Sequence, residues 1–119
     1  MRRQLAVHGG PVHARLYEYS GHTYLVLADP VDVVEMLPLT SGAAGRVREA
    51  LRSPHPADGP CRLELVERTG ELALTVLDLA SSADARALAL ALLTGDAHAE
   101  GARILDPAGA QLAWVPQRG

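Results

Sequence analysis

Two similar pairs of apolar-rich runs constrain the fold most, because each pair surrounds a two-residue turn. The first pair joins residues 12–19 and 22–28, and the second joins residues 61–68 and 71–77. Such turns connect antiparallel strands into hairpins, and they are too short for the crossover that parallel strands need. The sequence therefore predicts an antiparallel sheet and disfavours a doubly wound parallel one.

A helix candidate follows each hairpin. Residues 42–52 and 83–94 both come directly after serine or threonine, which can cap a helix, and both end before proline or glycine. We therefore expect an α+β fold, in which an antiparallel β-sheet built from hairpins carries two main helices on one face. The order of the elements also permits a ferredoxin-like core.

The length of 119 residues favours one domain, so we expect residues 1–119 to form a single α+β domain. Within it, residues 12–53 and 61–95 form possible half-repeats, because several residue types recur 49 positions apart. The proline-rich loop 53–60 joins them, and a closing hairpin follows at 103–115. The recurrence suggests a ββα duplication, although a biased composition can also produce identities this sparse.

The composition argues against several classes of protein. No apolar run is long enough to span a bilayer, and His8-Gly9-Gly10 stands where a signal peptide would need apolar residues. The formal net charge of −3 argues against a nucleic-acid partner. The single cysteine excludes an intramolecular disulfide framework and fits a reducing compartment. We expect a cytoplasmic protein with no membrane contact.

The missing residue types point to the genome and remove some chemistry. Lysine, phenylalanine and asparagine are absent, and isoleucine occurs once. These four types use AT-rich codons, so we expect the gene to come from a GC-rich genome, such as that of a high-GC bacterium. Without lysine the chain has neither a Schiff-base lysine nor the lysine of a phosphate-binding loop.

No group of residues predicts catalysis. The five histidines lack the spacings of zinc sites, and Cys61 should face the core as a small apolar residue. A short helical turn, expected from Asp29-Pro30 to before Pro38, would align Asp29, Asp32 and Glu35 for Mg²⁺. An aspartate before proline is, however, typical of a helix start. We predict no catalytic, cofactor-binding or metal-binding residue and no cofactor, which favours a non-enzyme.

The register of the first hairpin places every tyrosine on one face. Tyr17 should lie opposite Tyr24, and Tyr19 opposite His22, with Arg15 on the same face. The polar face of the second hairpin has no aromatic residue, so strand pairing alone does not require one. Tyrosine and arginine are enriched at interface hot spots, so we predict a partner-binding face here. Coverage of the tyrosines by a loop or a chain end is the alternative.

The helix expected at 83–94 is apolar on nearly every side. A helix of this kind should be buried all round, and one sheet covers only one side of it. A second subunit could cover the other side, with Leu90 as its contact, or the closing hairpin could do so. The sequence leaves both explanations open.

A weaker signal lies at the start of the first helix. Backbone N–H groups at a helix start made of small residues can hold an anion. This anion-binding candidate consists of Ser41, Gly42, Gly45 and Arg46.

Two functions therefore remain. The preferred one is a non-enzymatic cytoplasmic protein-interaction module, a homo-oligomer or a partner-docking domain, that uses the tyrosine-bearing face and the apolar helix. The alternative is a small-ligand or anion-binding domain, or a small enzyme, that uses the Ser41–Arg46 helix start or the histidine-bearing first hairpin.

Overall fold

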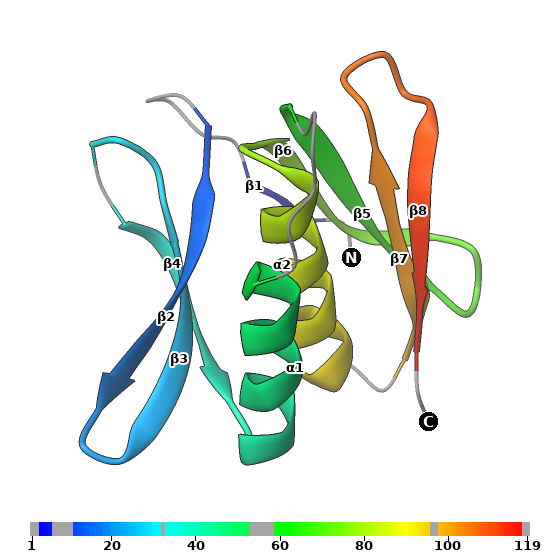
Figure 1. Ribbon diagram of the computed structural model, residues 1–119. Helices are drawn as coiled ribbons and strands as arrows, with labels where there is room; N and C mark the ends of the chain where they lie inside the picture. Colours follow the sequence, from blue (N-terminus) through cyan, green and yellow to red (C-terminus); the bar gives the residue numbers. More distant parts are fainter. Residues whose placement is uncertain (1–2, 6–10, 32, 53–58, 96–97, 118–119) are drawn as a thin grey trace.

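The chain folds into two β-sheets with two helices between them (Figure 1). The computed structural model describes residues 3–5, 11–31, 33–52, 59–95 and 98–117. In these ranges the three-stranded sheet has the order β2-β3-β4, and the five-stranded sheet has the order β1-β6-β5-β7-β8. The strands are β1 (Arg3–Leu5), β2 (His13–Tyr19), β3 (His22–Ala28), β4 (Val33–Leu39), β5 (Cys61–Glu67), β6 (Leu72–Leu79), β7 (Ala99–Leu105) and β8 (Gln111–Pro116). The described strands pair antiparallel, except that β1 runs parallel to β6.

The predicted hairpins are confirmed. In β2–β3, Tyr17 pairs with Tyr24 and Tyr19 pairs with His22, as the two-residue turn requires. Ser20 and Gly21 have φ values of 53° and 78°, the left-handed backbone that a tight hairpin turn needs at both central positions. In β5–β6 and β7–β8 bulges interrupt the ladders, yet both are hairpins.

The two helices also begin and end close to where the sequence places them. Helix α1 (Ser41–Arg52) is capped by Thr40, whose hydroxyl accepts the Ala43 N–H at 3.2 Å. Helix α2 (Ser82–Gly95) is capped by Ser81, whose hydroxyl accepts the Asp84 N–H at 3.2 Å. Both caps are of the expected Ser/Thr type.

The expectation of one sheet with helices on one face was incomplete. Figure 1 shows α1 and α2 between the two sheets, with α1 against the three-stranded sheet and α2 against both. The ferredoxin-like alternative was wrong, because β3 and β5 would then share a sheet, and they belong to different ones. The apolar circumference of α2 gives the physical reason, since a helix that is apolar all round is buried best between two layers. Among the described residues, neither helix is long and apolar enough to cross a membrane.

The predicted helical turn before Pro38 was also wrong, because residues 33–39 form β4. Val33 is β-branched, and the run from Met36 to Leu39 alternates between exposed and half-buried positions, as a strand with one covered face does. Strand β4 lies at a sheet edge, where proline is tolerated within a strand. Because this segment is not helical, the three-residue spacing of Asp29, Asp32 and Glu35 does not place their carboxylates on one side of a helix.

The core fills the space between the sheets. Its largest fully buried side chains come from both sheets and both helices: Leu25, Leu27, Leu63, Leu79, Leu88, Ile104, Val12, Val47 and Val76. Cys61 is buried among them, as expected. Residues 53–58 of the proline-rich loop lie outside the described residues, and the ββα duplication stays a prediction.

Candidate functional site

The outer surface of the three-stranded sheet carries the residues that the hairpin register singled out. We call Arg15, Tyr17, Tyr19, His22 and Tyr24 the tyrosine face. Alternation along β2 and β3 directs them away from the helices, while their neighbours Leu25 and Leu27 are fully buried on the inner side. Tyr17 is 42% exposed and Tyr19 is 66% exposed, and Tyr24 is half-buried. No loop or chain end among the described residues buries the tyrosines.

The aromatic rings of this face are ordered relative to one another. Tyr17 and Tyr19 lie two residues apart on β2, and their rings stack with centroids 6.4 Å apart and an interplanar angle of 21°. Stacked aromatic pairs with centroids at this separation contribute about 0.5–1.5 kcal/mol beyond the burial of their area. Tyr17 and Tyr19 therefore form one continuous aromatic surface along β2.

The polar groups of the tyrosine face are not used inside the described part of the chain. Its five side chains form no hydrogen bond or ion pair with a described residue. The two glutamates of this sheet, Glu18 and Glu35, occupy positions of the opposite, inner face. Glu18 there meets Arg48 of α1 at 3.6 Å. The outer strand positions thus combine tyrosines with the Arg15 cation and no carboxylate.

Strand β4 extends this surface with apolar residues. The register places Pro38 opposite Tyr24 and Met36 opposite Val26, so both lie on the outer side. Met36 is 48% exposed, and Pro38 is exposed as well. A methionine is adaptable in its contacts, and exposed methionine is frequent at binding surfaces that accept more than one shape.

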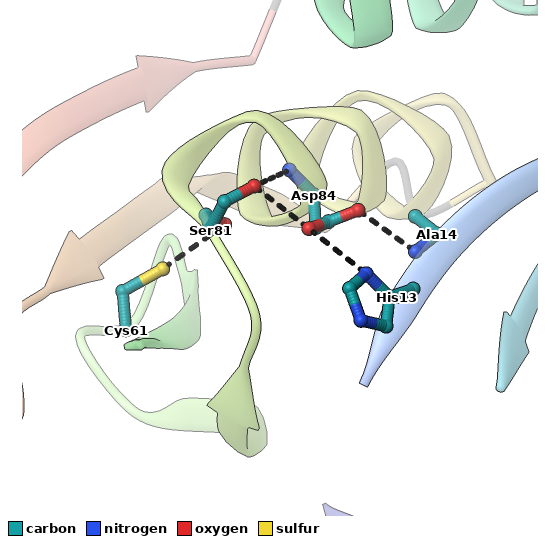
Figure 2. Close-up of polar contacts among 5 residues, drawn as sticks. All are labelled: His13, Ala14, Cys61, Ser81 and Asp84. Carbon is teal, nitrogen blue, oxygen red and sulfur yellow. Dashed lines mark hydrogen bonds and ion pairs between the residues drawn. The ribbon is translucent and has the colours of Figure 1, made fainter. Parts of the chain in front are cut away.

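A buried carboxylate fixes the strand that carries Tyr17 and Tyr19. Asp84 in the first turn of α2 accepts the Ala14 N–H at 2.9 Å and the Ser81 hydroxyl at 2.7 Å (Figure 2). Val12 donates to the Asp78 carbonyl and accepts from the Ala80 N–H, both at 2.9 Å. Strand β2 is therefore tied to the segment that leads into α2, which sets the position of the tyrosine face relative to the other sheet.

Sequence reasoning missed this network, although one half of it carries a signal. Ser81 and Asp84 are spaced like the two side chains of a capping box, which predicts a well-defined start of α2. The partner, the Ala14 N–H, lies 70 residues away and is a backbone group. No side-chain pattern can identify such a donor.

The same network lacks the connectivity of a serine nucleophile with its histidine base. The Ser81 hydroxyl donates to Asp84, whereas a serine nucleophile needs a base such as histidine beside it. His13 Nδ1 lies 4.0 Å from Asp84 Oδ2, at the limit of an ion pair. Cys61 is buried, and its thiol donates to the Ser81 carbonyl at 3.2 Å. Within the described ranges, no three or more His, Cys, Asp or Glu side chains are placed to hold a metal ion.

The structure brings together two residues that the sequence assigned to different roles. Arg46 of the anion-binding candidate and Leu90 of the partner-binding candidate line the same groove between α1, α2 and the end of β8. Ser41, Gly42 and Gly45 are exposed on α1 and do not line it. Leu90 is half-buried, and α2 is covered within the chain by both sheets and α1. A second subunit is not needed to bury the helix.

Comparisons with models of protein families, with curated proteins and with solved structures find no match to this chain.

Proposed function

We propose that the chain is a non-enzymatic interaction module of the cytoplasm, and that the tyrosine face docks an acidic, partly apolar segment of another protein. The observation that carries the proposal is the combination of exposed tyrosines with Arg15 and no carboxylate on the outer side of β2, β3 and β4. Tyrosine and arginine supply contact area and hydrogen-bond donors together, which is why they dominate interface hot spots.

The size of the face favours a segment over a second subunit. Three strands about 4.8 Å apart, each seven residues long at about 3.4 Å per residue, cover roughly 340 Å² in projection. A standard interface buries about 800 Å² of accessible surface on each partner, and although accessible area exceeds projected area, this face is small by comparison. Two copies joined by this face would also bring their Arg15 cations to the same interface, which is unfavourable.

Fluorescence anisotropy tests the proposal with a labelled peptide that carries glutamates among leucines. A matched peptide with glutamine in place of glutamate removes the charge and keeps the length. We expect the acidic peptide to bind more tightly, and added salt to weaken it. Tyr17→Ala should cost about 1–3 kcal/mol of binding free energy, about five- to 150-fold in affinity, and should change the free energy of unfolding less.

Leu112→Ala is the matched control variant. Leu112 is 56% exposed on β8 of the other sheet, so its loss removes a similar apolar side chain from a different surface. Its affinity for the acidic peptide should equal that of the unmodified chain. Equal binding of both peptides, or unchanged affinity of Tyr17→Ala, would contradict the proposal. If light scattering shows a dimer that Tyr17→Ala dissociates, the occupant of the tyrosine face is a second copy of the chain and not an acidic segment.

A further inference from the structure

The groove between the helices has the composition of a ligand site. It has a volume of about 330 Å³ and is lined by Arg46, Glu49, Ala50, Arg86, Leu90, Leu93, Thr94, Val115, Pro116 and Gln117. These residues come from α1, from α2, and from the end of β8 and Gln117 after it. The volume lies at the lower end of the range for small-molecule sites, about 300–1,000 Å³. It suits a molecule of metabolite size.

The bottom of the groove is apolar. Leu93 and Ala50 are buried, and Leu90 and Val115 are half-buried. The apolar surface that a ligand would cover is therefore already partly removed from water. Two backbone carbonyls of α2 in this region accept side-chain hydrogen bonds. Thr94 donates its hydroxyl to the Leu90 carbonyl, and the Gln117 amide donates to the Leu93 carbonyl, each at 2.8 Å. These two carbonyl oxygens are therefore already hydrogen-bonded within the chain.

Two arginines from different helices line the same groove. Arg46 projects from α1 and Arg86 from α2, and Arg86 is half-buried. Arg48 and Arg103 pair with Glu18 and Glu64, whereas neither groove arginine has an ion-pair or hydrogen-bond partner among the described residues.

The balance of charge sets the class of ligand. Like Arg15, Arg46 and Arg86 each carry a positive charge that no described carboxylate pairs with. Among the described residues that line the groove, Glu49 is the one carboxylate, so these residues carry a net charge of +1. A single negative charge matches this lining better than a phosphate dianion does. The planar guanidinium group of arginine is well suited to a carboxylate.

We infer that this groove binds a small monocarboxylate with an apolar body, such as a medium-chain fatty acid. The carboxylate lies between Arg46 and Arg86, and the hydrocarbon covers Leu90, Leu93 and Val115. This site is separate from the tyrosine face, which lies on the outer side of the three-stranded sheet. The inference therefore does not depend on the proposed docking function.

Isothermal titration calorimetry with octanoate, octanol and octylammonium tests the inference. The three probes share their hydrocarbon chain and differ in the charge of the head group. We expect octanoate to bind at least tenfold more tightly than octanol, and octylammonium to bind more weakly than either. Arg46→Gln and Arg86→Gln should each weaken octanoate binding five- to tenfold, because each removes a charged donor.

Two controls separate this site from the rest of the surface. Arg52→Gln removes an exposed arginine of α1 that does not line the groove, and Tyr17→Ala alters only the tyrosine face. Both should keep the octanoate affinity of the unmodified chain. Failure of octanoate to bind, equal affinity for octanoate and octanol, or unchanged affinity of both groove variants would overturn the inference.

Discussion

Replacing Asp84 tests how the strand that carries Tyr17 and Tyr19 is held in place. Asp84→Ala removes the acceptor of the Ser81 hydroxyl and of the Ala14 N–H, at 2.7 and 2.9 Å. A hydrogen bond to a charged group contributes about 1.5–3 kcal/mol, and a buried donor left without an acceptor costs a similar amount. Because Asp84 is buried, relief of its desolvation offsets part of the loss. We expect the free energy of unfolding to fall by about 2–4 kcal/mol.

Asp84→Asn is the companion variant, because its side-chain oxygen still accepts the Ala14 N–H. It should cost only about 1 kcal/mol. Asp106→Ala is the matched control, since Asp106 also accepts a backbone N–H, from Ala110 at 2.8 Å, but in an exposed turn. Its cost should stay below about 1 kcal/mol. Urea unfolding followed by circular dichroism gives all three values. A loss below about 1 kcal/mol for Asp84→Ala, or equal losses for both Asp84 variants, would refute the reasoning.

Two further substitutions test the local geometry. Ser20→Asn should raise the free energy of unfolding by about 0.5–1 kcal/mol in urea, because asparagine tolerates the left-handed backbone at Ser20 better than serine does; a loss of stability would contradict the turn geometry. Gly101→Ala should lower it by about 1–3 kcal/mol, because the added methyl group would lie 2.7 Å from the Val115 carbonyl oxygen and closer to the Trp114 ring. The same substitution should shift the emission maximum of Trp114, the single tryptophan. An unchanged emission spectrum together with an unchanged free energy of unfolding would show that the ring does not lie over Gly101.

The parts of the fold that local rules determine could be predicted from the sequence. The turn at Ser20-Gly21 fixes the register of β2 and β3, so the pairing of Tyr17 with Tyr24 follows from chain geometry alone. The caps of α1 and α2 are equally local, since Thr40 and Ser81 act on groups three residues away. Composition and spacing are sufficient for features of this kind.

The parts that depend on distant partners could not be predicted. The sequence shows that α2 is apolar all round but not what covers it, and the structure supplies a second sheet where a second subunit was one possibility. Strand β4 adopts its conformation because β3 offers it an edge, which overrides the helix start suggested by Asp29-Pro30. Arg46 and Arg86 share a groove because α1 packs on α2. Each of these outcomes depends on tertiary packing.

An NMR titration of the isotope-labelled chain with the acidic peptide tests most directly whether the tyrosine face is the docking surface. Amide shifts should concentrate in β2, β3 and β4, strongest around Tyr17, Tyr19 and Tyr24, and the residues of α2 should keep their positions in the spectrum. Shifts confined to the helices or to the outer side of the five-stranded sheet would contradict the claim, as would a spectrum that the peptide leaves unchanged.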